Sequence, residues 1–316
     1  PPRSTLFPYT TLFRSKQSER LLKNRAVDFS YAMEKEGATL RWRACAYFDL
    51  GFLALNMRTI SHKVFPYQKL NIPDPITKSL SLAHEKQGLI LLTGITGSGK
   101  STTMDSIIDA NNQTVDGHIV VVGDPIEYIH ESKRCIVRHR EVGRDVPSFK
   151  DGAVQALRQD PDIIVIGEMR DPETIMTCLE IVDTGHKVFS TLHTGSAVET
   201  IDRIVAECPG NEQDRVRNRL ADVLRVIISQ KLIPGAEGKL VLAKEILLVS
   251  SPVRAAIRNR NTHEIYQMIS EAGKWGMMTL EQDLLRLWKM RLITEGDAFD
   301  YANNKRRMQE LMYQRV

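Results

Sequence analysis

The stretch Gly94-Ile95-Thr96-Gly97-Ser98-Gly99-Lys100-Ser101-Thr102 has the spacing G-x-x-x-x-G-K-S of a nucleotide phosphate loop. Glycines let a backbone approach phosphate groups closely, and the N–H groups of such a loop point inward toward them. The apolar run Gly88 to Thr93 predicts a buried strand before the loop. Residues Ser101 to Ile108 can form a helix behind it, whose N-terminus adds partial positive charge. We therefore expect a triphosphate here, with Lys100 at its β- and γ-phosphates and the Ser101 hydroxyl on Mg²⁺.

The composition is that of an ordinary globular protein, with 42% apolar and 26% charged residues in 316, enough for about two domains. The net charge of +4 comes without a dominant basic block, so charge alone predicts no particular partner. The four cysteines form no C-x-x-C pair, which favours free thiols in a reducing compartment. No apolar run approaches the ~20 residues that span a bilayer, and no signal peptide is evident, so we expect a soluble, cytoplasmic protein.

Two segments of the N-terminal region give no indication of a packed fold. Residues 1–15, PPRSTLFPYTTLFRS, resemble a translated sequencing adapter, and on this interpretation the natural chain begins near Lys16 and is truncated upstream. Residues 67–79 contain two closely spaced prolines and predict a linker.

Between these segments, residues 16–66 predict part of a small sheet domain. The segments 40–48 and 52–58 are rich in apolar and aromatic residues and predict two strands, joined by a turn at Asp49-Leu50-Gly51. Two or three strands rarely stand alone, so we interpret this region as the remaining half of a larger sheet.

Residues 80–240 predict an α/β core in which short apolar strands alternate with helices. Helix starts are indicated at Ser148, at Asp171-Pro172 and at Ser196-x-x-Glu199, which has the spacing of a capping box. Apolar runs between helices are typical of a parallel sheet that is buried on both faces. The strands are expected at residues 88–93, 119–122, 163–166 and 188–191.

Residues 241–316 predict a helical C-terminal region. One helix is expected to begin at Thr279, and a last one to run from Glu295 to about Gln314. The last helix contains the basic run Lys305-Arg306-Arg307, for which a solvated helix face is favoured over a binding patch.

Polar residues at the ends of the predicted strands are the candidates for chemistry. Glu168 ends an apolar strand and could hold the water shell of a metal or polarise an attacking water, whereas a helix-start cluster would not explain it. Asp124 and Glu127 follow the strand at 119–122 and either face the nucleotide or form a turn. His193 follows the strand at 188–191 and either senses the γ-phosphate or is structural, with sensing favoured.

The order of these motifs resembles the type IV pilus and type II secretion ATPase superfamily, above all its twitching-motility retraction (PilT-type) branch. The motifs are GITGSGKST, GDPIEYIHESKR, REVGRDVPSF, DPDIIVIGEMRDPET, TGHKVFSTLHT and ISQKL. The resemblance implies a RecA-like ATPase core behind a PAS-like N-terminal domain, a homo-hexameric ring, and ATP with Mg²⁺. It places the functional residues at Asp124 and Glu127 (aspartate box), Glu168 (second Walker motif), His193 (histidine box), and Arg43 and Arg58 (N-terminal arginines).

Two features favour the retraction branch over the assembly and secretion branches. A tetracysteine zinc insertion is missing from the sequence, and the segment Gly276 to Leu284 resembles a late helix of the retraction ATPases. Two departures also occur. Position 123 is Gly where the family usually has Glu, which removes a carboxylate near the metal, and the family's AIRNLIRE segment is matched only in part by Pro252 to Asn259.

The sequence thus predicts an Mg-ATP-driven hexameric motor for pilus retraction, peripheral to the inner membrane and acting on a platform protein of the pilus machine. Asp124, Glu168 and Ser101 would surround the metal, and Arg43 or Arg58 would compensate charge during hydrolysis. The alternatives are an assembly or type II secretion ATPase, an accessory paralogue, or a RecA-type nucleic-acid translocase. Nucleic acid is not expected, because no arginine and aromatic interleaving indicates a strand-binding channel.

Overall fold

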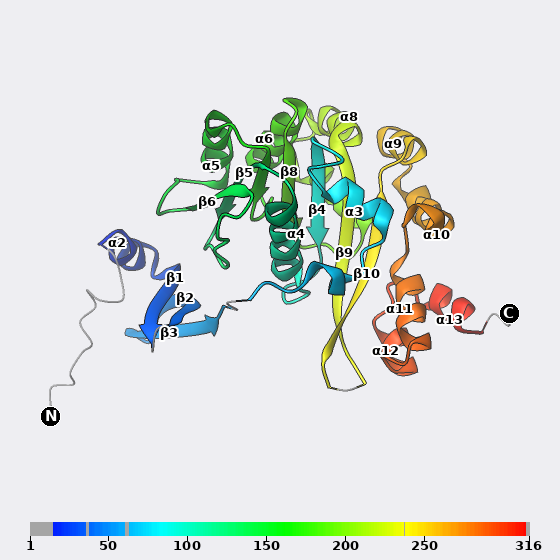
Figure 1. Cartoon of the computed structure of the whole chain (residues 1–316), viewed down its shortest axis with the longest axis horizontal. Helices are drawn as coiled ribbons and strands as arrows, with labels where there is room; N and C mark the ends of the chain where they lie inside the picture. The colour runs from blue at the N-terminus through cyan, green and yellow to red at the C-terminus, as the bar shows by residue number, and fades with distance from the viewer. Residues whose placement is uncertain (1–14, 36–37, 61–62, 237, 314–316) are drawn as a thin grey trace.

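The computed structural model contains a small N-terminal sheet, a large central sheet covered by helices, and a C-terminal group of helices (Figure 1). Within the part of the chain that is described, no helix is long and apolar enough to cross a bilayer. The adapter-like segment lies outside the described residues except for Ser15. The structure describes the chain except residues 1–14, 36–37, 61–62, 237 and 314–316.

The N-terminal sheet is antiparallel, and its strands follow one another in sequence order. The two strands expected at 40–48 and 52–58 are confirmed, and a further strand precedes them. Leu50 and Gly51 join the last two strands with positive φ angles of 47° and 87°, a turn whose twist matches an antiparallel pair. The elements are α2 (Ser15–Asn24), β1 (Ala26–Lys35), β2 (Ala38–Asp49) and β3 (Phe52–Thr59).

The two faces of this sheet differ in chemistry. Phe29 and Ala44 belong to a small apolar core on one face, which also receives Leu21 from α2. Ser30 and Arg43 are their neighbours in the chain, and since strand side chains alternate they point to the other face. Side chains on that polar face form hydrogen bonds with a strand end and a loop of the central sheet.

The central sheet has seven strands in the order β10-β9-β4-β8-β7-β5-β6. All neighbouring pairs are parallel except β9 and β10, which form an antiparallel hairpin. The four strands expected from the sequence are confirmed in β4, β5, β7 and β8, and the α/β class with them. The bounds are β4 (Gly88–Thr93), β5 (Gly117–Gly123), β6 (Cys135–Glu141), β7 (Ile163–Ile166), β8 (Lys187–Leu192), β9 (Leu224–Pro234) and β10 (Leu240–Leu248).

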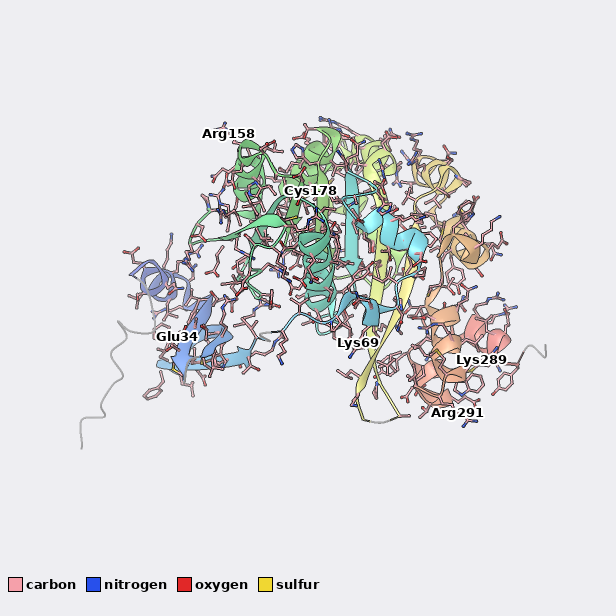
Figure 2. The ribbon with its side chains drawn as sticks, viewed as in Figure 1. Glu34, Lys69, Arg158, Cys178, Lys289 and Arg291 are labelled. Carbon is pink, nitrogen blue, oxygen red and sulfur yellow. The ribbon has the colours of Figure 1, made fainter. Side chains whose placement is uncertain are left out.

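Helices cover both faces of this sheet, as Figure 1 shows. Leu89 and Leu91 of β4 belong to one apolar cluster, and Ile90 and Leu92 to a second cluster on the opposite face. Cys178, on α6, lies fully buried in the first cluster (Figure 2). The covering helices are α3 (Asp74–Leu80) and α4 (Lys100–Thr114) on one face, and α5 (Phe149–Ala156), α6 (Pro172–Asp183), α7 (Ala197–Glu207), α8 (Gln213–Val223), α9 (Ser251–Arg258) and α10 (Ile265–Glu271) on the other.

The C-terminal helices form a third cluster against the β9–β10 hairpin. These helices are α11 (Leu280–Lys289), α12 (Glu295–Asp300) and α13 (Lys305–Tyr313). The single helix expected from Glu295 to Gln314 is therefore wrong. The chain breaks after α12, and Asn304 restarts it by accepting the N–H of Arg307 at 2.9 Å, as a capping residue does.

Most predicted helix starts are confirmed, with one difference in detail. The side chains of Ser148, Asp171, Ser196 and Thr279 each accept the backbone N–H three residues later. The expected capping box at Ser196 is incomplete, because the Glu199 carboxylate accepts the N–H of Gly195 instead.

Two further expectations are corrected by the structure. The chain does not become helical at Val241, because Leu240–Leu248 pairs with β9 and the next helix begins at Ser251. The expected linker 67–79 is mostly helical. It contains a 3₁₀ turn and α3, whose Ile76 is fully buried, since proline in the first turn favours a helix start.

Candidate active site

The phosphate-loop motif forms the connection between β4 and α4. Gly94 has a φ of 143°, and a Cβ atom there would lie 2.4 Å from the Gln230 carbonyl oxygen and from Ser98 Oγ. Only glycine fits this position. Gly99 has a φ of 90° and immediately precedes α4, whose N-terminus is capped by no side chain.

Lys100 is largely buried inside this loop. Its Nζ donates to the carbonyl oxygens of Gly94 at 2.7 Å and Ile95 at 3.1 Å. Burial lowers the pKa of Lys100, and the Glu168 carboxylate opposes that shift. Ser98 Oγ is buried without a hydrogen-bond partner. A cation, an unpartnered hydroxyl and an open helix N-terminus together fit a bound phosphate chain.

Glu168 lies just beyond β7, on a segment fixed to both neighbouring strands. Gly167 N–H donates to the carbonyl of Val122 on β5 at 2.8 Å, and Met169 N–H donates to the carbonyl of Thr191 on β8 at 3.1 Å. Because β4, β5, β7 and β8 are parallel, their carboxyl ends meet at one edge of the sheet.

The Glu168 carboxylate makes one ion pair and one contact with a histidine ring. Arg170 NH2 lies 2.7 Å from Oε2, and His193 Nε2 lies 3.2 Å from Oε1. Burial and the nearby Lys100 lower the pKa of His193, with Glu168 acting in the opposite direction. His193 is therefore mainly neutral at pH 7, and its Nε2–H can donate to Glu168.

A cavity of about 320 Å³ opens beside this pair. Glu168 and His193 lie on its wall together with two arginines, so charged groups surround an otherwise apolar hollow. The lining residues are Glu168, Met169, Arg170, Ile175, Leu192, His193, Arg203, Ile204 and Glu207.

The aspartate-box residues lie beyond β5 and contact the N-terminal sheet. Arg43 NH1 lies 3.1 Å from Glu127 Oε1. Asp124 is exposed, yet desolvation by the groups around it and then the Asp28 carboxylate raise its pKa. Arg58 lies opposite Arg43 in the β2–β3 register, and in the described structure it has no hydrogen bond or ion pair.

Two further residues of this contact were missed from the sequence. Arg41 donates to the backbone carbonyl oxygens of Glu127 at 2.9 Å and Ile126 at 3.2 Å. Glu141, at the end of β6, accepts from Ser30 Oγ at 2.8 Å and from the N–H of Ile126 at 3.3 Å. Arg41 stands two residues before Arg43 on the same face, which is the signal that could have indicated it.

The end of the aspartate-box loop is bound to α4. His130 Nε2 lies 3.1 Å from Asp105 Oδ1, and the N–H of His130 donates to His139 Nε2 at 3.1 Å. Burial and the neighbouring His130 lower the pKa of His139 to about 4. The phosphate-loop helix and the aspartate box are thereby held together.

Comparison with known proteins identifies the family. Residues 50–268 match the model of the type II/IV secretion system proteins. The type IV pilus retraction ATPase PilT of Pseudomonas aeruginosa is 39% identical over 291 residues, which cover 92% of this chain and 83% of that protein. The chain belongs to the PilT-type branch of the type II/IV secretion ATPases. A twitching motility protein of Neisseria gonorrhoeae is 37% identical over 95% of this chain and 79% of its own length.

The fold of this PilT-type ATPase agrees with a solved member of the branch. The crystal structure of the pilus retraction motor PilT with bound ADP superposes with a TM-score of 0.84 at 41% identity, and covers 95% of this chain and 84% of that one. The expected α/β fold and the assignment as an ATPase are confirmed, and a nucleotide is the ligand that the phosphate loop takes.

Proposed function

We propose that the protein is an Mg-ATP-driven hexameric motor that powers type IV pilus retraction. It would act at the cytoplasmic base of the machine, peripheral to the inner membrane, on a platform protein. The observation that carries this proposal is the Glu168–His193 pair beside Lys100, in a chain that resembles pilus retraction ATPases over nearly its whole length.

The phosphate loop supplies the binding half of the site. The backbone of residues 94–102 would surround the phosphates, and Lys100 would exchange its two carbonyl partners for the β- and γ-phosphate oxygens. Ser101 is exposed at the start of α4 and would be a direct ligand of Mg²⁺. Mg²⁺ keeps several waters and needs few protein ligands, which fits a site where no three described His, Cys, Asp or Glu side chains gather. When bound, the metal would neutralise charge on the phosphates.

Hydrolysis would depend on the carboxylates beyond the strands. Glu168 would orient and polarise the attacking water, and the neutral His193 would position Glu168 and sense the γ-phosphate. Asp124 and Glu127 would lie in the outer shell of the metal. Arg43 holds Glu127 in this structure, and Arg43 or Arg58 would provide charge compensation when the N-terminal sheet closes on a nucleotide.

The proposal predicts that specific ATPase activity rises steeply with protein concentration, because a ring completes its sites between subunits. Turnover is measured per subunit over a wide concentration range, with Lys100→Ala as the blank and the exposed Lys69→Ala as the matched control. Lys69→Ala keeps wild-type turnover. Flat, substantial activity would contradict a ring-dependent site, and stimulation by single-stranded DNA would favour the translocase.

A weakly hydrolysing accessory ATPase is the second candidate, and Gly123 is the observation that favours it. A Cβ atom at position 123 would lie 2.7 Å from the flexible Ile126 Cδ1, so a side chain there requires only a shift of Ile126. Gly123→Glu restores a carboxylate beside Asp124, and we expect turnover to rise about tenfold while nucleotide affinity stays unchanged. Steady-state kinetics of Gly123→Glu, with Gly123→Ala as control, distinguish the motor from the weakly hydrolysing ATPase. Equal rates for the two variants would contradict a role for the carboxylate.

A further inference from the structure

The loop that carries His193 is bonded on both sides to the C-terminal part of the chain. Asn303, between α12 and α13, donates from Nδ2 to the Gly195 carbonyl oxygen at 3.1 Å. The N–H of Ala197, the first residue of α7, donates to Glu245 Oε1 at 2.7 Å. We call residues 193–196 the histidine loop. Asn303 binds this loop at Gly195, and Glu245 binds the first residue of the helix that follows it.

Glu245 connects two helix N-termini. It lies on β10 and is only 3% exposed. Its carboxylate accepts the N–H of Ala197 at the start of α7, and the N–H of Leu280 at the start of α11 lies close enough to favour the charged form. A carboxylate can accept both donors and is favoured electrostatically at both positive helix ends. An apolar packing role would not require a charged group there.

The surroundings of Glu245 contain three titratable groups. Glu281 on α11 is fully buried and accepts from Tyr266 Oη of α10 at 2.9 Å and from the N–H of Asn304 at 2.8 Å. Lys231 on β9 donates from Nζ to Asn303 Oδ1 at 2.7 Å. Burial raises the pKa of Glu245 to about 7, with Glu281 adding to the shift and the two backbone N–H groups and Lys231 opposing it.

We propose that Glu245 and Asn303 are positioning residues that fasten the histidine loop to helices α11 to α13. Through them, the placement of His193 against Glu168 depends on where the C-terminal helices lie. A displacement of these helices would then change the rate of hydrolysis without any contact to the nucleotide. This inference rests on the proposed role of His193 in turnover.

The test uses three variants of the full chain. Glu245→Gln keeps the shape of the side chain but offers one acceptor oxygen where two N–H groups converge. Asn303→Ala removes the second contact at an exposed position, where loss of folding is not expected. Glu271→Gln is the control, because Glu271 is an exposed carboxylate at the end of α10 that accepts a hydrogen bond from Gln267 Nε2 of the same helix at 2.6 Å.

The kinetic readout separates positioning from general damage. We expect Glu245→Gln to lower kcat about tenfold at pH 8 and Asn303→Ala about threefold, with KM for ATP unchanged, because neither residue touches the phosphate loop. Wild-type kcat should rise from pH 6 to pH 8 as Glu245 loses its proton. Glu245→Gln should lack that rise, and Glu271→Gln should retain it.

A second readout does not require activity. Hydrogen exchange of peptides covering 193–200 should become faster in Glu245→Gln and Asn303→Ala, and stay as in the wild type in Glu271→Gln. Unchanged exchange and kcat in both variants would overturn the inference. Faster exchange with unchanged kcat would overturn the dependence of turnover on the loop. If His193→Ala itself leaves turnover unchanged, the proposed role of His193 fails, which is a different result.

Discussion

Glu168 takes its position from bonds made by the residues on either side of it. The N–H groups of Gly167 and Met169 bind the ends of β5 and β8, so the carboxylate between them has little freedom. Arg170 and the neutral His193 contact its two oxygens, and the side chain lies on the wall of the cavity. A carboxylate fixed in this way is suited to orienting water and is not needed for nucleotide binding.

We therefore expect Glu168→Gln to lower turnover by a factor of about 10² to 10³ and to leave ATP affinity nearly unchanged. Single-turnover hydrolysis and equilibrium binding, measured on one preparation, check both parts. The exposed Glu173→Gln is the control and keeps full turnover. A loss of affinity in proportion to rate would assign Glu168 to binding.

At the scale of single residues, the sequence indicates Lys100 by its phosphate-loop motif, and Glu168 and His193 by their places at the ends of predicted strands. The structure brings these three residues together, because the carboxyl ends of parallel strands meet at one edge of the sheet. Arg41 and Glu141 could not be found in this way. Their partners are backbone groups and side chains far away in the chain, which become neighbours only when the N-terminal sheet packs on the core.

At the scale of the elements, the contact between β6 and the aspartate-box loop requires a neutral histidine. His139 accepts the N–H of His130, so a protonated ring would lose this bond and place a charge in a buried site. The pKa of His139 is about 4 in the folded protein against about 6.5 when unfolded. Between these values the unfolded chain binds more protons, so stability falls as the pH drops from 6.5 to 4.

This linkage amounts to about 3 kcal/mol at most for His139. We expect His139→Gln to lose less stability than the wild type over this pH range, as measured by urea denaturation at each pH. His263→Gln removes an exposed histidine and should follow the wild-type curve. Parallel curves for all three proteins would show that His139 does not contribute.

The elements that sequence analysis assigned wrongly share a cause. Pro73 and Pro75 predict a linker, although Pro75 lies in the first turn of α3, where proline fits a helix. The sequence places the apolar run of β10 in a helical region, because a short apolar run does not distinguish a strand from a buried helix. In both cases packing on the central sheet determines which secondary structure forms. The local sequence pattern contains no information about that packing.

At the scale of the whole molecule, the N-terminal sheet docks on the core through polar contacts. The apolar cluster of this sheet is separate from the three clusters of the rest of the molecule. The hydrogen bonds of Ser30 and Arg41 and the ion pair of Arg43 cross between the two parts. Such contacts are weakened by salt more than apolar packing is.

We expect Arg41→Ala to loosen this docking and to accelerate trypsin cleavage of the connection between β3 and α3 about tenfold, because two carbonyl oxygens lose a charged donor. Added salt should have the same effect on the wild type. Arg25→Ala, on the N-terminal sheet but in contact with Phe48 of the same sheet, is the control. Equal cleavage of all three proteins would argue against a docked sheet.

The polar character of this contact also has a calorimetric consequence. Exposure of apolar surface raises the heat capacity, whereas exposure of polar surface lowers it slightly. Release of the N-terminal sheet would expose mainly polar groups, so its enthalpy should change little with temperature. The enthalpy of opening this contact would then be similar at low and at high temperature. The stability of the apolar cores on either side of it would change over the same range.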